Sequence, residues 1–171
     1  MLATAERRLL LVTITLMGLI AGFFYAYSCS VMVGLARTDD LTFVTTMQWI
    51  NATVRNVGFA PSFFGSLLCV FAVAGVALWR RSPARWWITG AAVCYAVAFG
   101  VTTFINVPMN ETLAAAGPAD AVADLAGLRR DYEDPWVRWN LVRTVLSTLA
   151  LVALARAAQL PGRTTSATPA R

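Results

Sequence analysis

The 171-residue sequence contains no histidine and no lysine, and only three of its residues are cysteine. Without histidine there is no Ser-His or Cys-His pair for nucleophilic catalysis, and no standard ligand set for a catalytic metal. Cys29, Cys69 and Cys94 fall in three different apolar segments, where cysteine usually packs as a small hydrophobic side chain. The sequence therefore argues against a triad hydrolase and against a metal enzyme, and we predict no metal site.

Charged residues are also scarce, at 13% of the chain, whereas 58% of the residues are hydrophobic. This balance is typical of integral membrane proteins rather than soluble domains. Three apolar segments are long enough to cross a bilayer, namely residues 9–35, 57–79 and 86–105. A fourth, 136–158, is interrupted by polar residues. We predict an all-α integral membrane four-helix bundle.

The bundle is expected to form a single domain over residues 1–160. The remaining segment, 161–171, is rich in Thr, Ser, Pro and Ala, which predicts a disordered cytoplasmic tail.

The net charge of +5 comes entirely from arginines, which gather near the ends of the predicted helices. This pattern sets membrane topology and gives no support for nucleic-acid binding. Arginines precede the first helix and fill the second loop, so both termini are expected in the cytoplasm. The absence of lysine beside abundant alanine and arginine favours a bacterial chain in the inner (plasma) membrane.

Two short helices are expected on the extracytoplasmic face. Asp39 or Asp40 is a suitable N-cap for the first, whose apolar residues follow at helical spacing. The second is predicted to start at Pro118, with acidic residues early and arginines late, and to end before Pro135.

The first predicted span carries a small residue at every fourth position, namely Gly18, Gly22, Ala26, Ser30 and Gly34. Such a stripe lets another helix backbone come close. It predicts close packing either inside the bundle or between the subunits of a homo-oligomer.

The segment "WVRWNLVRT" places Trp136, Asn140 and Arg143 on one helix face, with Trp139 beside them. An arginine at the middle of a membrane helix costs about 2.5–3.5 kcal/mol to insert, so it needs a partner, a wet cavity or a path to the headgroups. Other polar residues enter or leave the helices at the same outer end, namely Gln48, Asn51, Asn106 and Asn110. We therefore favour an outward-facing polar pocket over an arginine that reaches to the lipid headgroups.

Three segments, "GLARTDDLTFVTTMQWIN", "NVPMNETL" and "WVRWNLVRT", on a four-helix membrane scaffold resemble the anthrone oxygenase-like family. The resemblance implies O₂-dependent oxidation of a flat phenolic or quinone-type substrate without an evident cofactor. It points to catalytic roles for Asn110, Asn140 and Arg143. The residues expected to bind the substrate are Gln48, Asn51, Trp136 and Trp139.

Two positions depart from the family's pattern: Leu141 stands where many members have histidine, and Val57 where many have proline. Loss of the histidine removes the obvious base for an anthrone. A second hypothesis is therefore a non-enzymatic or accessory membrane protein that holds a lipid or quinone in the same pocket. Either way, the expected partners are the membrane and a small hydrophobic aromatic molecule, quinone or lipid.

Overall fold

The computed structural model describes residues 4–160, and over this range the chain contains helices and no strands. Four helices are long and apolar enough to cross a membrane: Ala5–Leu35, Pro61–Trp79, Arg85–Ala115 and Leu125–Gln159. The protein is thus an all-helical integral membrane protein, as the sequence predicts. The predicted tail at 161–171 lies outside the described residues.

Most of these long helices are composite, because a π-helical turn interrupts the α-helical hydrogen bonding. The elements of the first are α1 (Thr4–Ala26), η1 (Tyr27–Val31) and α2 (Met32–Leu35). The second comprises η2 (Pro61–Gly65) and α4 (Ser66–Trp79), and the third comprises α5 (Arg85–Val101), η3 (Thr102–Asn106) and α6 (Val107–Ala115). The fourth is the single helix α7 (Leu125–Gln159).

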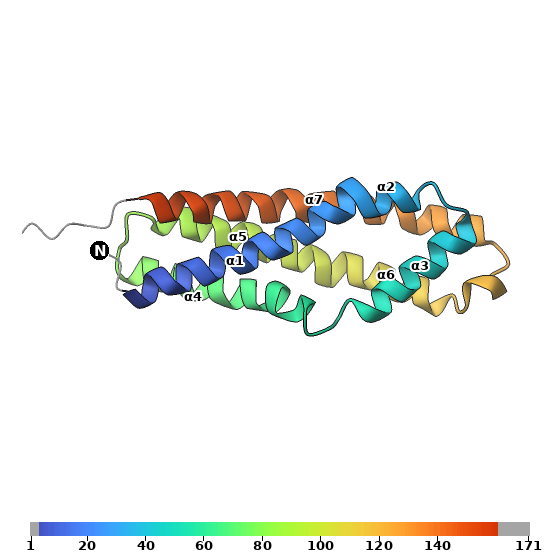
Figure 1. Ribbon diagram of the computed structural model, residues 1–171, viewed down its shortest axis with the longest axis horizontal. Coiled ribbons are helices and arrows are strands. Elements are labelled where there is room, and N and C mark those ends of the chain that lie inside the picture. The colour runs from blue at the N-terminus through green and yellow to red at the C-terminus, as the bar shows by residue number, and fades with distance from the viewer. Residues whose placement is uncertain (1–3, 161–171) are drawn as a thin grey trace, which may run out of the picture.

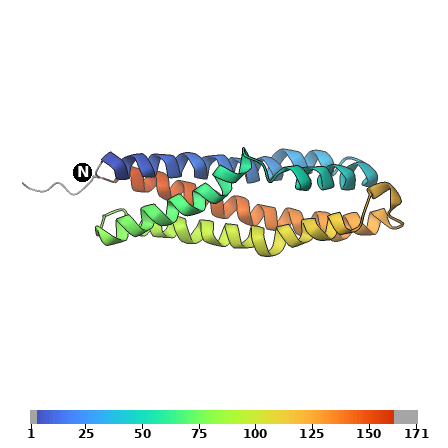
Figure 2. The same ribbon diagram turned by 90° about the horizontal axis from the view of Figure 1, so that it is seen from below.

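The long helices lie side by side along the long axis of the molecule, with α1 against α4 and α7, and α5 against the same two (Figures 1 and 2). One end of the molecule holds the start of α1, the end of α7 and the turn after Arg80, and we call it the Arg80 end. The opposite end holds α2, α3 (Asp40–Thr53) and α6, and we call it the α3 end.

The half of the molecule toward the Arg80 end encloses a core of apolar side chains, here called the apolar core. Its members include Met17, Ile20, Val70, Tyr95 and Leu154, all fully buried. Alanines fill much of the rest, and small residues allow membrane helices to pack at short distance. The half toward the α3 end has a second and smaller group, the α3-end core, made of Met32, Phe43, Val44, Met47, Leu113, Ala119, Tyr132 and Trp136.

The helix α3 begins as the sequence predicts, because the Asp39 side chain caps it. The backbone N–H of Thr42 donates to Asp39 at 2.9 Å and lowers the pKa of that carboxyl. In Figure 1 α3 slopes away from α2 toward α6, and it packs on α6 and α7.

The second short outer helix was predicted wrongly. After Pro118 the chain forms only a single 3₁₀ turn, η4 (Ala119–Ala121), and α7 then begins at Leu125 and continues through Pro135. Its N-cap is Asp124, which accepts from the Gly127 N–H at 2.8 Å. Packing on both sides of the proline holds the helix together, and membrane helices tolerate proline where neighbours compensate.

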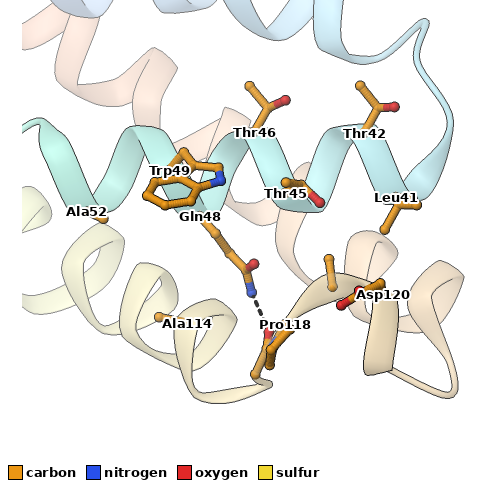
Figure 3. Close-up of a pocket in the computed structure, with 12 residues that line it drawn as sticks. Leu41, Thr42, Thr45, Thr46, Gln48, Trp49, Ala52, Ala114, Pro118 and Asp120 are labelled. Carbon is orange, nitrogen blue, oxygen red and sulfur yellow. Dashed lines mark hydrogen bonds between the residues drawn. The ribbon is translucent and has the colours of Figure 1, made fainter.

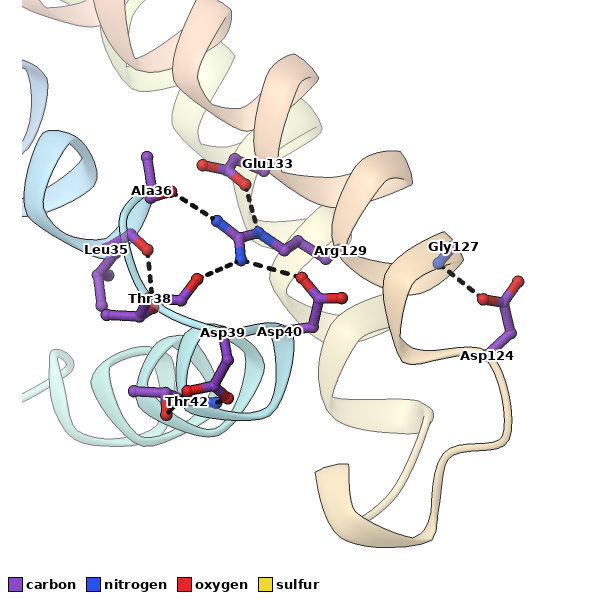
Figure 4. A network of polar contacts seen from close by, with 10 residues as sticks. All are labelled: Leu35, Ala36, Thr38, Asp39, Asp40, Thr42, Asp124, Gly127, Arg129 and Glu133. Carbon is purple, nitrogen blue, oxygen red and sulfur yellow. Dashed lines mark hydrogen bonds and ion pairs between the residues drawn. The ribbon is translucent and has the colours of Figure 1, made fainter.

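Arg129 of α7 ties the segment before α3 to the bundle (Figure 4). Its Nη1 donates to the Thr38 carbonyl at 2.8 Å and to the Asp40 carboxylate at 3.0 Å, while Nε donates to Glu133 at 2.6 Å. The guanidinium also lies 4.4 Å from the centroid of the Phe43 ring. Charge-assisted hydrogen bonds are the stronger kind, so this one side chain fixes how α3 docks on α7.

The stripe of small residues on the first long helix faces outward along most of its length. Gly22, Ala26, Ser30 and Gly34 are exposed, and a Cβ placed on Gly22 or Gly34 would meet no atom within 4 Å. Close packing within the chain therefore does not account for the stripe. Contact between subunits stays a prediction.

Candidate functional site

Arg143 is buried inside the bundle. Only 5% of the residue is exposed, and its guanidinium carbon lies 4.5 Å from the centroid of the Phe24 ring and 5.2 Å from that of the Trp136 ring. Aromatic faces attract a cation most strongly where water is absent. The side chain does not reach to the bundle surface, as an arginine among lipid headgroups would.

Asn140 holds the guanidinium in place from one turn away. Its Oδ1 accepts from Arg143 Nη2 at 2.8 Å, while its Nδ2 donates to the Phe24 carbonyl at 3.0 Å and to Ser28 Oγ at 2.8 Å. Thr144 Oγ1 lies 3.1 Å from the same serine oxygen. Asn140 thus links α7 to the first long helix at the point where its π-helical turn begins, and such turns are frequent at functional sites.

The charge of Arg143 has no opposite charge beside it. None of the ion pairs among residues 4–160 includes Arg143, and its Nε is buried with no hydrogen-bond partner in that part of the chain. A guanidinium carries five donors, of which one makes the bond to Asn140. Because a buried charge without a counter-charge destabilises a fold, the site is suited to an added anion or carbonyl oxygen.

A second set of polar side chains lies next to Arg143, on the side of the α3 end. Asn110 Oδ1 accepts from Tyr132 Oη at 2.8 Å and from Trp136 Nε1 at 2.9 Å. Tyr132 Oη in turn accepts from Asn51 Nδ2 at 3.2 Å. Since Trp136 also contacts Arg143, the two sets form one group, the polar cluster, whose members are buried or half-buried: Ser28, Asn51, Asn110, Tyr132, Trp136, Asn140, Arg143 and Thr144.

Two of the predicted site residues lie apart from the polar cluster. Gln48 Nε2 donates to the carbonyls of Leu113 and Gly117, both at 2.9 Å, and so ties α3 to the end of α6. Figure 3 shows this amide at the wall of an open groove of about 930 Å³ between α3 and the turn before Pro118. Trp139 is 38% exposed and lies on the outer surface of α7.

Three members of the polar cluster were missed in the sequence. Tyr132 was assigned to a separate outer helix, although it lies four residues before Trp136 and so shares its face once α7 is continuous. Thr144 lies four residues after Asn140 and so shares its face of α7, but a threonine in a membrane helix usually bonds to its own backbone, as Thr144 also does here. No signal in the sequence joins Ser28 to Asn140.

The polar cluster can supply hydrogen-bond donors, a fixed positive charge and aromatic faces. Among the described residues, no three His, Cys, Asp or Glu side chains lie close enough together to hold a metal ion. Donors held in place around a low-dielectric site stabilise negative charge that develops on an oxygen atom. The arrangement therefore fits a ligand that is flat, largely apolar and carries an oxygen able to become negative.

A model of the anthrone oxygenase family matches residues 47–153. The match covers more than half of the chain, from within α3 to near the end of α7, and so includes Asn51, Asn110, Tyr132, Asn140 and Arg143. Comparisons with curated proteins and with solved structures find no match. The chain belongs to the anthrone oxygenase family.

Proposed function

We propose that this protein oxidises a flat phenolic or anthrone-like substrate with O₂, and that Arg143 binds the oxygen of that substrate. The observation that carries the proposal is the buried guanidinium between Phe24 and Trp136, which has donors to spare and no carboxylate partner within residues 4–160. A planar aromatic oxyanion satisfies both the charge and the ring faces. The family to which the chain belongs adds independent support for the reaction class.

The reaction can be written without a cofactor. Anthrone and O₂ give anthraquinone and water: the substrate carbon opposite the carbonyl loses two hydrogens and gains one oxygen atom, while O₂ is reduced. Reaction with O₂ begins from the ionised, phenolate-like form of anthrone, in which the negative charge rests largely on the oxygen. A fixed guanidinium stabilises this anion, and the proton that ionisation releases passes to water.

The replacement of histidine by Leu141 bears little on this proposal. Leu141 is 54% exposed, on a face of α7 that points away from Arg143. A histidine there would lie outside the polar cluster of this chain. Stabilising the ionised substrate therefore falls to Arg143, with Asn140 holding the guanidinium in position.

The second candidate is a membrane protein that holds a quinone or lipid without reaction. Asn140 Nδ2 is already engaged by Phe24 and Ser28, and Asn110 Oδ1 by Tyr132 and Trp136, which leaves few groups free to move protons. A site with one free cation suits binding as well as catalysis. Turnover separates the two candidates.

We infer that the Arg80 end faces the cytoplasm, with both termini on that side. The turn after α4 and the first turn of α5 carry Arg80, Arg81 and Arg85, and positively charged residues are retained on the cytoplasmic side. Labelling single cysteines introduced at Ser82 and Ala123 tests this orientation. Impermeant reagent added outside should reach residue 123 and not residue 82; the reverse would invert the topology.

The test of function is the oxidation of anthrone by the purified protein in lipid vesicles. We expect one O₂ consumed for each anthraquinone formed, and at least a tenfold lower rate for Arg143→Gln. Arg138→Gln is the matched control, because Arg138 lies on the same helix and is exposed. Tight binding of anthraquinone without any turnover would favour the second candidate, and equal rates for both variants would contradict the role of Arg143.

A further inference from the structure

A series of aromatic rings in contact leads from Arg143 to the side of the bundle. The ring centroids of Trp136 and Tyr27 are 5.6 Å apart, those of Tyr27 and Phe23 are 5.1 Å apart, and those of Phe23 and Phe59 are 5.2 Å apart. Each distance falls within the range of direct ring–ring contact. Arg143 contacts the first ring of the series, and the last two, Phe23 and Phe59, are half-buried.

At Phe59 the series reaches a place where the helical wall of the bundle is broken, and beyond it the Phe63 ring stacks on Phe59 at 5.2 Å between centroids. Between α3 and η2, residues 54–58 form a bend and a turn, and Val57 at its tip is 92% exposed. The other long helices are continuous at this level, as far as residues 4–160 show. Phe59 therefore lies beside this break in the helical wall, next to α1, and we call this place the Phe59 seam.

The Phe59 seam lies at a depth that lipid tails reach. The helix Pro61–Trp79 has 19 residues and so measures about 28 Å, close to the hydrocarbon thickness of about 30 Å. With Trp79 and Trp86 exposed at the Arg80 end, the turn at 54–58 falls near the opposite boundary of the hydrocarbon layer.

Packed side chains close the two routes along the bundle axis. Toward the Arg80 end the buried face of α7 continues from Arg143 through Ser147 to Ala150 and Leu154, where the apolar core begins. Toward the α3 end, the packed side chains of the α3-end core close the second route. Arg129 holds the start of α3 against α7 beside this core. A route through the side is shorter and passes mainly aromatic rings.

We propose that the ligand of Arg143 is an uncharged, flat aromatic molecule dissolved in the bilayer, which enters through the Phe59 seam and passes along Phe23 and Tyr27. This inference rests on the proposed function for the identity of the site. A flat ligand exchanges ring–ring contacts for contacts of the same kind at each step, so no polar group is left unpaired along the way. It becomes charged only where the guanidinium stabilises its oxygen.

The test measures the binding kinetics of 2-hydroxyanthraquinone in phosphatidylcholine vesicles containing the protein. This probe is already oxidised, so it binds without turnover, and its absorption shifts to longer wavelength when the hydroxyl ionises. A residue at an entrance changes the association and dissociation rates by the same factor and leaves Kd unchanged. We expect Phe59→Trp to slow both rates at least threefold, and Phe59→Leu to raise both.

Phe64→Trp and Phe64→Leu are the matched controls, because Phe64 is 53% exposed and contacts Phe63 and Phe99. Its ring is separated from Phe59 by the Phe63 ring, which stacks on Phe59. If Phe59→Trp fails to fold, Phe59→Leu tests the same entrance in the opposite direction.

Unchanged rates in the Phe59 variants, together with weak binding by Arg143→Gln, would overturn the proposed route and leave the proposed function standing. If Kd changes in the Phe59 variants while the association rate does not, Phe59 lines the binding site itself. That result would overturn the proposal that Phe59 stands at the entrance. Unaltered binding by Arg143→Gln would contradict the proposed function itself.

Discussion

The two halves of the molecule bury different kinds of side chain. Toward the Arg80 end, the interior is filled by apolar residues, with many alanines between larger groups such as Met17 and Leu154. Toward the α3 end, a charged side chain, four amides and a tyrosine lie between the helices, each hydrogen-bonded to a partner on another element or, for Arg143, on its own helix. Apolar packing is the cheaper way to hold helices together, because buried polar groups must all be satisfied. This difference is the basis for our proposal that the first half serves the fold and the second serves a ligand.

The largest effect on stability is expected in the apolar core. Leu154→Ala removes a fully buried side chain of α7 and leaves a cavity, which costs about 2–5 kcal/mol. Binding by the protein that remains folded should be unchanged, because Leu154 lies well away from Arg143. Thermal unfolding in detergent micelles checks the loss. Leu149→Ala is the control on the same helix, since Leu149 is 52% exposed and should cost little.

The next effect is expected at the α3 end, where Arg129 holds the start of α3 against α7. Arg129→Gln removes charge-assisted hydrogen bonds to Thr38, Asp40 and Glu133, and should destabilise the protein by about 2–3 kcal/mol. The loss should be local, so limited proteolysis should cut the chain between α2 and α3 sooner than in the parent. Arg130→Gln, on an exposed position next to it, should behave like the parent. If the two variants are cut by the protease at the same rate, α3 is held by its apolar face alone.

A smaller effect is expected within the polar cluster. Tyr132→Phe removes the hydroxyl that joins Asn51 to Asn110, which should cost about 1 kcal/mol. Combining it with Asn51→Ala gives a double-mutant cycle, and a coupling energy near zero would contradict the hydrogen bond between the two residues. Tyr25→Phe is the control, because Tyr25 is 60% exposed.

Much of the fold can be read from the sequence, because long uncharged segments have few alternatives to membrane helices. The four spans and the N-cap of α3 at Asp39 follow from length, hydropathy and capping preference. The start of α7 does not. Pro135 was taken as the end of a separate helix, whereas Tyr132 and Trp136 on either side of it are anchored to Asn110 and carry the helix through. Tertiary contacts decided the outcome, and the proline alone could not reveal them.

The candidate site was predictable only in part. Asn140 and Arg143 share a helix face, and their burial follows from the cost of exposing an arginine to lipid tails. Gln48 could not be distinguished from Asn51 by pattern, since the two are three residues apart on α3. The structure separates them, because Gln48 reaches the backbone at the end of α6 while Asn51 reaches Tyr132. The hydrogen-bond partners on other helices therefore distinguish the two residues, and the sequence pattern does not reveal those partners.

The central claim is that Arg143 serves a ligand and not the fold, and it is tested by measuring binding and stability on the same samples. For Arg143→Gln in vesicles, the affinity for 2-hydroxyanthraquinone should fall at least tenfold, about 1.4 kcal/mol. Arg143→Lys should lose almost as much, since a point charge does not copy the planar fork of donors. Both variants should unfold at nearly the temperature of the parent, because the cost of burying the charge offsets the hydrogen bond and ring contacts that the guanidinium makes. If the lysine variant binds like the parent, or if either variant loses stability while keeping its affinity, Arg143 is a structural residue and the account is contradicted.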